Sequence, residues 1–400
     1  MAGGGGTESP EAGRHSHFQV RWPPGGGAGG RPLSGVRVLE LSRILAGPYC
    51  TMQLADLGAD VIKVEPPTGD ETRRWGPPFA GDTAAYFTSA NRNKRSVVLD
   101  LKQESGRRVL GDLVAQADVV VHNYTERVST QLGIDREWLA GRNPNCIVCR
   151  ISGFADGSDQ PAYDLVLQAA SGLMAITGQP DGPPTKVGVA VADVAAGMFA
   201  AIAIVAELFA RGQGGRRPEV EVSILDSALA LLVNQGASWL ASGDDPQRRG
   251  NDHPNVVPYG LFPTGDGDLV LAVGNDRQFG ALTQVLGAPE LAHDPRFASN
   301  SSRVSNRTAL RRVLEDKLSA RGAEDWRQLL QLVGVPCGRV RTVAESLSRA
   351  ADRLVVRMPK NGGPTEGQVM SPIRLDGNYL RPYRPSPQLG EEQISPGGVD

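Results

Sequence analysis

The chain has 400 residues, of which 40% are hydrophobic and 22% are charged, and its formal net charge is −2. This balance gives no overall attraction to nucleic acid or to an anionic membrane surface, so neither is an expected partner. The length is enough for two or three domains, or for one large domain with an insertion.

The first 31 residues are rich in glycine and proline and contain no apolar run. This composition predicts a disordered tail at 1–31 and argues against a secretory signal. No run of 18 uncharged apolar residues follows, so no transmembrane helix is expected.

The chain from Pro32 to Phe154 is predicted to be α/β, doubly wound and Rossmann-like. A strand at 35–42, a helix at 46–59 and a strand at 60–67 form a βαβ unit, which implies a parallel sheet with a right-handed crossover. The further elements predicted here are strands at 95–101, 118–124 and 145–154 and an amphipathic helix at 104–117.

The rest of the chain alternates between helical patterns and one hairpin. The polar loop 242–255 is a predicted boundary, because it is rich in Gly, Asp, Pro and Arg. The predicted elements are helices at 163–177 and 191–212, a strand and a long helix within 216–243, a hairpin at 259–275, two or three helices between Phe279 and Val333, a strand and a helix within 335–347, and an extended tail from Arg381.

Missing motifs exclude several classes of enzyme. The first strand is followed by "SRILAGPYC", with one glycine where a dinucleotide fingerprint has three, so an NAD- or FAD-dependent oxidoreductase is disfavoured. HExxH, GxSxG and Walker A motifs are absent. Cys146 and Cys149 form a Cys-x-x-Cys pair without a second pair or nearby histidines. They predict buried strand residues, no metal site and a reducing, cytoplasmic location, with mitochondrial import left open.

A basic cluster surrounds the strand predicted at 95–101. It consists of Arg92, Lys94, Arg95 and Lys102. Exposed basic residues are usually only solvated, but a cluster at the end of a sheet could hold phosphate groups. The sequence leaves both interpretations open.

One carboxylate, Asp193, stands at the start of the apolar helix predicted at 191–212. One interpretation is an N-cap, because aspartate accepts hydrogen bonds from the free N–H groups of a first helical turn. The other is a covalent nucleophile. The helix N-terminus favours the anion, so we expect the carboxylate to stay ionised in apolar surroundings. Asp164 also begins a predicted helix, and there the cap is the favoured interpretation.

Six stretches stand in order between Pro32 and Gly390: "RILAGPYCTMQLADLGADVIKVEPPTGDETRRWGPPF", "NRNKRSVVLDLK", "DVVVHNY", "YDLVLQAASGLMAITGQPDGPPTKVGVAVADVAAG", "GNDHPNVVPYGLF" and "GVPCGRV". Together they resemble the class III CoA-transferases. This is the family of formyl-CoA transferase and carnitine CoA-transferase, and it includes α-methylacyl-CoA racemase. The resemblance is closest to members that pass CoA from succinyl-CoA to dicarboxylates such as glutarate.

The resemblance implies an interlocked homodimer of two ring-like subunits. Each subunit has a Rossmann-like large domain, built from N- and C-terminal parts, with a smaller α+β domain inserted between them. On this sequence the large domain takes 32–245, the small domain 246–332 and the returning segment 333–400.

The resemblance also implies an enzyme that moves CoA between an acyl-CoA donor and a carboxylate acceptor. The aspartate at the position of Asp193 is the nucleophile and carries an aspartyl-CoA thioester, and Asp164 matches an acidic residue beside the active site. Coenzyme A is a co-substrate, and no tightly bound cofactor is implied. Each covalent intermediate keeps the energy of the thioester, so the reaction needs no ATP.

Other positions match binding residues of the family. Gly250 and His253 lie in "RRGNDHPN", which matches the loop that covers the active site and protects the intermediates from water. The positions that match the lining of the CoA channel are Arg43, Ala46, Leu99, Lys102, Asn123 and Tyr124.

Two alternatives stay open beside the transferase. A racemase of this family uses a histidine opposite the aspartate, and that position is Tyr163. Tyrosine has a reference pKa of about 10, which suits proton exchange at neutral pH poorly. A non-catalytic CoA-binding protein would show affinity without turnover. Leu45 stands where some transferases have a glutamine that steers the acceptor, so the identity of the acceptor is left open.

Overall fold

The computed structural model describes residues 20–158, 160–214, 219–360 and 363–394. The chain divides into two compact units. The first comprises the described residues within Met1–Gln160, Ala196–Ser223 and Val356–Asp400, and the second those within Pro161–Ala195 and Ile224–Val355. The domain limits predicted at 32–245, 246–332 and 333–400 stay a prediction.

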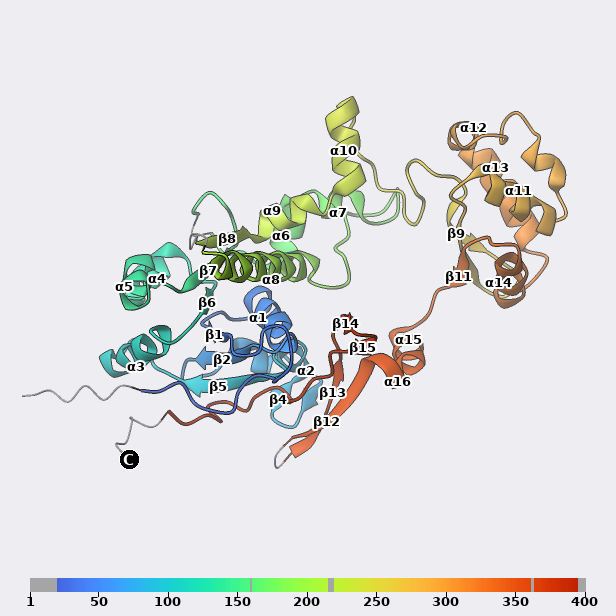
Figure 1. Ribbon diagram of the computed structural model, residues 1–400. Helices are drawn as coiled ribbons and strands as arrows, with labels where there is room; N and C mark the ends of the chain where they lie inside the picture. The colour runs from blue at the N-terminus through green and yellow to red at the C-terminus, as the bar shows by residue number, and fades with distance from the viewer. Residues whose placement is uncertain (1–19, 159, 215–218, 361–362, 395–400) are drawn as a thin grey trace, which may run out of the picture. The chain divides into compact units, whose positions relative to one another are not determined.

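A six-stranded parallel sheet forms the centre of the first unit (Figure 1). Its strand order is β5-β2-β1-β6-β7-β8. The inner strands β2 and β6 are buried along their whole length, as expected for parallel strands covered by helices, although β2 carries three charged residues. The predicted α/β fold with a parallel sheet is therefore confirmed. The strands are β1 Arg37–Glu40, β2 Asp60–Glu65, β5 Lys94–Val98, β6 Val119–His122, β7 Ile147–Ser152 and β8 Val220–Ser223.

Helices and short segments surround this sheet. The helices predicted at 46–59 and 104–117 are present as α1, Ala46–Asp56, and α3, Glu104–Val114. Helices α4 and α5 were not predicted, although Thr125 and Asp135 provide side-chain N-caps for them. The other elements are α4 Glu126–Leu132, α5 Arg136–Arg142, α2 Ala85–Thr88, the 3-10 helix η1 Glu71–Arg74, β3 Phe79–Ala80 and β4 Thr83–Ala84.

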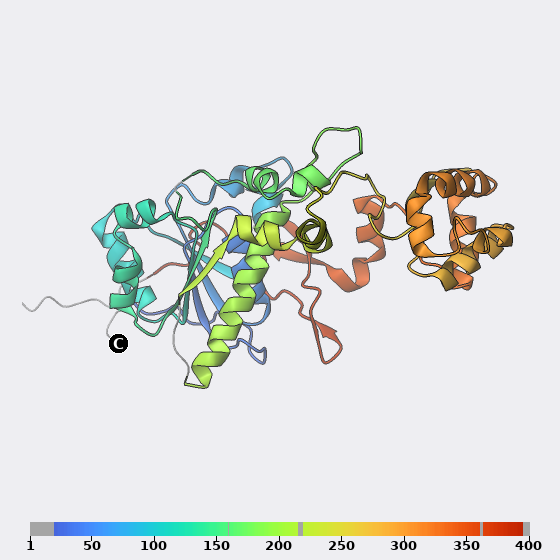
Figure 2. The ribbon, with the colours of Figure 1, turned by 90° about the horizontal axis from the view of Figure 1, so that it is seen from above.

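Helix α8, Val191–Gly212, runs through both units, and its part in the first unit packs against α1 (Figures 1 and 2). A Cβ atom at Gly197 would lie 2.6 Å from the carbonyl oxygen of Ala46, so a glycine is needed for this close approach. By length and composition alone α8 could cross a membrane, and 44% of its most apolar window is buried. Its packing against α1 leads us to interpret it as a core helix.

The direction of the strand order reverses at β1. From β1 the chain moves outward through β2 to β5, and then returns to β6 on the other side of β1. Ligands of open parallel sheets bind beyond the carboxyl ends of the strands at such a switch point. The loops that follow β1 and β6 carry Arg43 and Asn123, so both residues lie at this position.

The C-terminal segment belongs to the first unit. In its extended part, the backbone N–H of Glu392 donates to the carbonyl oxygen of Ser96 in the edge strand β5, at 3.0 Å. The extended tail predicted from Arg381 is confirmed for the described residues. Before it lie two strand pairs, β12 Val355–Lys360 with β13 Gly363–Val369 and β14 Arg374–Leu375 with β15 Asn378–Tyr379.

The predicted disordered tail is wrong for residues 20–31. Val20 and Trp22 are buried, and the indole N–H of Trp22 donates to Oδ2 of Asp60 at 2.8 Å. The side chain of Gln116 bonds the backbone of both residues. A buried aromatic ring with a hydrogen-bond partner anchors this segment despite the glycines around it. Residues 1–19 lie outside the described residues.

The second unit contains a small antiparallel sheet with helices packed around it (Figure 1). The predicted hairpin is confirmed as β9 Tyr259–Pro263 and β10 Asp268–Ala272, and the predicted return strand is β11, Cys337–Arg339. Four α-helices, not two or three, lie between the hairpin and β11 in this described stretch. They are α11 Asp276–Val285, α12 Asn300–Ser305, α13 Arg307–Leu318 and α14 Ala323–Leu332, with the 3-10 helix η2 Pro289–Ala292.

Two predicted helices are each broken in two. The helix expected at 163–177 forms α6, Asp164–Ala170, and α7, Leu173–Ile176, because Gly172 adopts a left-handed conformation with φ of 85°. The long helix expected within 216–243 ends at Ala230 and resumes at Val233. The segments are α9 Ile224–Ala230 and α10 Val233–Ser242, and α15 Val343–Arg349 and α16 Ala351–Leu354 follow β11.

Candidate active site

Asp193 lies in the first turn of α8, as its third residue, and is 8% exposed. It is therefore not the N-cap, and that interpretation is wrong. Among the described residues, its carboxylate has no hydrogen bond or ion pair. The neighbouring Ala192, Ala195 and Ala196 are almost completely buried, so their small size serves close packing and leaves no open space of their own.

Asp164 caps the helix that carries Asp193. Its Oδ1 atom accepts hydrogen bonds from the backbone N–H groups of Ala192, at 2.9 Å, and of Asp193, at 3.3 Å. Asp164 is the first residue of α6 and gives that helix no side-chain cap. The predicted cap is thus present, but it serves another helix 28 residues further along the chain. The partial positive charge of the N-terminus of α8 stabilises the Asp164 carboxylate.

Gln168 holds the Asp164 carboxylate in place. Its amide Nε2 donates to Oδ2 of Asp164 at 2.5 Å, and its Oε1 accepts from the N–H of Val187 at 2.9 Å. Gln168 is completely buried. Gln168 was not among the predicted site residues, although its spacing of four from Asp164 places both on one face of a helix.

The pKa of Asp193 is raised to about 7. Burial is the main cause, and the negative charge of Asp164 adds to it. The expectation that the helix N-terminus keeps Asp193 ionised is wrong, because Asp164 takes the first-turn N–H groups. At neutral pH the carboxyl and carboxylate forms of Asp193 are therefore both populated.

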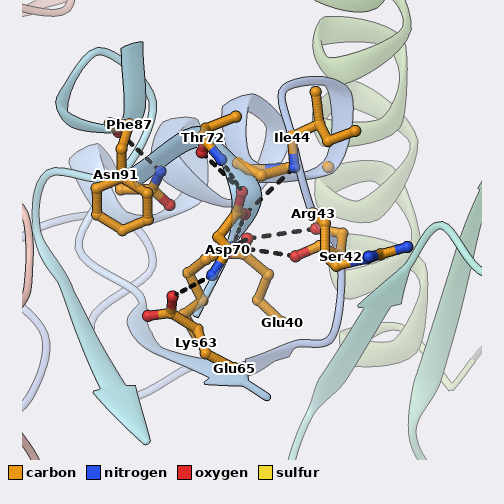
Figure 3. Close-up of polar contacts among 12 residues, drawn as sticks. Glu40, Ser42, Arg43, Ile44, Lys63, Glu65, Asp70, Thr72, Phe87 and Asn91 are labelled. Atoms are coloured by element: carbon orange, nitrogen blue, oxygen red, sulfur yellow. Dashed lines mark hydrogen bonds and ion pairs between the residues drawn. The ribbon is translucent and has the colours of Figure 1, made fainter. Parts of the chain in front are cut away.

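The first unit holds the six positions matched to CoA contacts. Asn123 and Arg43 bind each other at the switch point: the N–H of Arg43 donates to Oδ1 of Asn123 at 3.1 Å, and Nδ2 of Asn123 donates to the carbonyl oxygen of Arg43 at 2.9 Å. Asn123 thus fixes the backbone of the loop after β1. The Arg43 guanidinium pairs with Glu71 at 2.5 Å (Figure 3 shows the loop).

The other four positions differ in exposure. Ala46 is buried and opens α1, whereas Lys102 is exposed and leaves its ammonium group accessible. Leu99 and Tyr124 are partly buried and pack against the core of the first unit. Burial raises the pKa of Tyr124, so it stays a neutral hydroxyl.

The phosphate-binding interpretation is wrong for three members of the basic cluster. Arg92, Lys94 and Arg95 are buried, and each is paired with a carboxylate inside the first unit. The pairs are Arg92 with Asp56 at 2.5 Å, Lys94 with Glu40 at 2.8 Å and Arg95 with Asp60 at 2.7 Å. Lys102 is the one residue of the four that the described structure leaves exposed.

The loop matched to the active-site cover makes defined contacts within the second unit. The N–H of Gly250 donates to the carbonyl oxygen of Gly178 at 2.9 Å. Gly250 has a φ of 59°, which favours glycine. Nδ1 of His253 accepts from the N–H of Asn255 at 3.1 Å, and its ring lies 5.1 Å from that of Tyr259. This nitrogen is therefore engaged in a turn of the loop itself.

Tyr163 precedes Asp164 and is 56% exposed. Its side chain gives α6 no cap hydrogen bond. Over the described ranges, no cluster of three or more His, Cys, Asp or Glu residues is placed to hold a metal ion. The site therefore offers one buried carboxylate with a raised pKa, Asp193, on a helix turn that a second carboxylate, Asp164, holds in place.

Comparison with known families gives a match over most of the chain. The model of CoA-transferase family III matches residues 33–393. The succinate–glutarate CoA-transferase of Agrobacterium fabrum is 42% identical over 375 residues, which cover 90% of this chain and 94% of that protein. The acetyl-CoA:oxalate CoA-transferase of Acetobacter aceti is 40% identical, with coverage of 90% and 94%.

Solved structures give the same result for the fold. The crystal structure of a CAIB/BAIF family protein from Brucella suis has a TM-score of 0.79 and 41% sequence identity to this chain. The match covers 90% of this chain and 97% of that one.

Proposed function

The chain belongs to CoA-transferase family III, and from this membership we propose that it moves CoA from a donor such as succinyl-CoA to a small carboxylic or dicarboxylic acid, with Asp193 as the nucleophile. The observation that carries the proposal is the buried Asp193 carboxylate, free of hydrogen bonds within the described residues, beside a second acid that caps its helix.

The proposed reaction runs through four acyl transfers at Asp193. The carboxylate attacks the donor thioester carbonyl, which gives a mixed anhydride and CoA thiolate. The thiolate attacks the aspartyl carbonyl, which releases the donor acid and leaves an aspartyl-CoA thioester. The acceptor carboxylate then displaces CoA to form a second anhydride. Attack of CoA thiolate on the acceptor acyl carbon gives the new acyl-CoA and restores Asp193.

The raised pKa of Asp193 suits this role. A carboxylate of higher basicity is a better nucleophile, and a pKa of about 7 leaves part of the residue ionised at neutral pH. Asp164 contributes by orientation, because it fixes the first turn of α8 through the N–H of Asp193 itself. Gln168 supports Asp164 in the same role.

Coenzyme A enters as a co-substrate, and the proposal assigns its contacts to the switch point of the first unit. The N-cap of α1, Leu45, gives the first turn no side-chain acceptor. An uncapped helix N-terminus attracts phosphate groups, and α1 begins at Ala46. Lys102 adds positive charge, Arg43 offers a guanidinium that also pairs with Glu71, and Asn123 fixes the loop that carries Arg43. Leu99 and Tyr124 complete the proposed set.

The acceptor is proposed to be a small dicarboxylate. The support is the relative from Agrobacterium fabrum, whose name gives succinate and glutarate. The loop with Gly250 and His253 is proposed to cover the anhydride intermediates and exclude water.

We also propose that two copies form an interlocked homodimer. Along α8 the large apolar side chains Met198, Phe199, Ile202, Val205 and Phe209 are exposed. Met198 and Phe199 are adjacent, and the later members follow at spacings of three to four residues, which places the set along one side of the helix. An exposed apolar stripe of this length marks an interaction surface. A cytoplasmic location is part of the proposal, since the four cysteines are free thiols.

The test uses purified protein, succinyl-CoA and a mixed panel of carboxylic acids, with mass spectrometry of the CoA pool. A new acyl-CoA formed by the wild type and not by Asp193→Ala supports the proposal and identifies the acceptor. Loss of α-deuterium from a 2-methylacyl-CoA without transfer would instead support a racemase. CoA binding without either reaction would indicate a non-catalytic CoA-binding protein.

A further inference from the structure

The loop between β1 and α1 contains a strained residue. Ile44 has a φ of 73°, in the left-handed region. A β-branched side chain rarely adopts this conformation, because its branched Cβ crowds the backbone. Such a residue persists only where the surrounding structure holds it, and it is often found at functional sites. Ile44 lies between Arg43 and Ala46, the two proposed CoA contacts of this loop.

Asp70 binds the backbone of the strained residue. Its Oδ2 atom accepts the N–H of Ile44 at 3.2 Å and also pairs with Nζ of Lys63 at 3.0 Å. Its Oδ1 atom accepts the N–H and the hydroxyl of Thr72 at 3.0 and 2.7 Å. Figure 3 shows Asp70 at the centre of these contacts. Both carboxylate oxygens of Asp70 are therefore held by donors from neighbouring residues.

Lys63 extends the same support to Ser42, two residues before Ile44. Its ammonium group donates to the carbonyl oxygen of Ser42 at 3.0 Å and pairs with Glu40 at 2.9 Å. The side chains of Lys63, Glu40 and Asp70 are all completely buried. Loss of one partner from a buried ionic group leaves an uncompensated charge, so breaking any of these contacts is strongly unfavourable.

The charges in this cluster keep Asp70 ionised. Burial alone would raise its pKa, but Lys63 and the hydrogen bonds from Thr72 outweigh burial, so the pKa lies below its usual value. An ionised carboxylate offers both of its oxygens as acceptors only, and here each oxygen faces two donors.

The residue after Asp70 reaches the same loop through its side chain. Glu71 pairs with the guanidinium of Arg43 at 2.5 Å. Two consecutive residues thus bind the loop, Asp70 at the backbone of Ile44 and Glu71 at the side chain of Arg43. The backbone of Asp70 is itself fixed, because its N–H donates to Oε2 of Glu65 at 2.9 Å.

We propose that Asp70 is a positioning residue for coenzyme A: by binding the N–H of Ile44 it holds the loop after β1 in the strained conformation that sets Arg43 and the first turn of α1 against CoA. This inference rests on the proposed role of Arg43 and Ala46 in CoA binding. Asp70 acts through the loop and does not itself touch the substrate.

The test measures the binding of free CoA by isothermal titration calorimetry to the wild type, Asp70→Asn, Ile44→Gly and the double variant. Asparagine keeps the shape, but whichever way its amide is turned, its NH2 group faces donors that the carboxylate accepted. Loss of this charge-assisted contact is expected to raise the Kd for CoA about tenfold. Glycine adopts positive φ without strain, so Ile44→Gly is expected to restore most of the affinity in the Asp70→Asn background.

Asp60→Asn is the matched control. Asp60 is a buried carboxylate at the start of β2, paired with Arg95 at 2.7 Å, and it makes no contact with the loop after β1 within the described residues. Its substitution is expected to lower the melting temperature and to leave the Kd for CoA unchanged. Equal weakening of CoA binding by Asp60→Asn and Asp70→Asn, or no recovery with Ile44→Gly, would overturn the inference.

Hydrogen–deuterium exchange of the peptide that spans residues 41–45 separates this inference from the proposed function. If the wild type binds no CoA, the proposed function fails, and the exchange rate then decides the role of Asp70. Faster exchange in Asp70→Asn than in Asp60→Asn supports control of the loop by Asp70. Equal exchange in the two variants contradicts it.

Discussion

The backbone N–H of Asp193 donates to the carboxylate of Asp164, with 3.3 Å between nitrogen and Oδ1. The two acids are 29 residues apart in sequence and act together. The carboxylate of Asp164 caps helix α8, so the carboxylate of Asp193 receives no hydrogen bond from the first-turn N–H groups. Hydrogen bonds from the first-turn N–H groups to the Asp193 carboxylate would have lowered its pKa. Their use by Asp164 leaves burial and like charge to raise it.

We expect the pH dependence of kcat/KM to report the ionisation of Asp193. Activity should rise with pH and level off above an apparent pKa of about 7, because the proposed nucleophile is the ionised carboxylate. In Asp164→Asn the amide oxygen still accepts the N–H groups, but the negative charge is gone. The rising limb should therefore move to lower pH. A limb that stays in place in this variant would exclude electrostatic coupling between the two residues.

Ionisation of Asp193 should cost stability at alkaline pH. A carboxyl whose pKa is raised in the folded state contributes stability below its unfolded pKa, near 3.8, and loses it as the pH rises through about 7. Asp193→Asn should therefore be more stable than the wild type at pH 8, by on the order of 2–4 kcal/mol, with a smaller difference at pH 5. Chemical denaturation at both pH values measures this, and a difference independent of pH would contradict it.

Gln168 is expected to contribute to kcat through positioning, beyond its contribution to the stability of the fold. Gln168→Leu removes the donor to Asp164 and the acceptor for Val187, and we expect about a tenfold loss in kcat from misorientation of the first turn of α8. Gln116→Leu is the control, because it removes comparable bonds to Val20 and Trp22. The control should lower the melting temperature and keep kcat. Equal kcat in wild type and Gln168→Leu would refute the positioning role.

The apolar stripe on α8 should control the oligomeric state. Ile202 is 65% exposed in the single chain. A charge at the centre of an apolar interface is strongly unfavourable, so Ile202→Glu should reduce the mass measured by light scattering from dimer to monomer. Ile202→Leu keeps the apolar surface and should stay dimeric. A wild-type protein that is monomeric at micromolar concentration would rule out the proposed dimer.

The sequence predicted the parts of the fold that depend on local pattern. The alternating run before Ser42 and the amphipathic helix near Leu110 have clear periodicity, and both elements are present. Gly172 and Val233 break helices by their backbone conformation, which a hydrophobic pattern does not show. The buried Trp22 anchors a segment whose glycines and prolines predict disorder.

The candidate site could be predicted only in part. Asp193 and Asp164 stand out as acids at helix starts, but which helix Asp164 caps depends on the path of the intervening chain. The buried pairing of Arg92 and Arg95 was hidden for the same reason, since their partners Asp56 and Asp60 lie 35 or more residues earlier. Long-range pairing of charges has no periodicity in the sequence.

The two hydrogen bonds between the Asn123 side chain and the Arg43 backbone affect the order of folding. The donor and the acceptor of the Arg43 backbone are both bound by one side chain 80 residues later. During synthesis, a nascent chain that has emerged only as far as α3 contains β1, α1, β2 and β5 but lacks this partner. The loop after β1 acquires its final shape only when β6 has joined the sheet, so the loop that we propose binds CoA is completed after the strands that flank it.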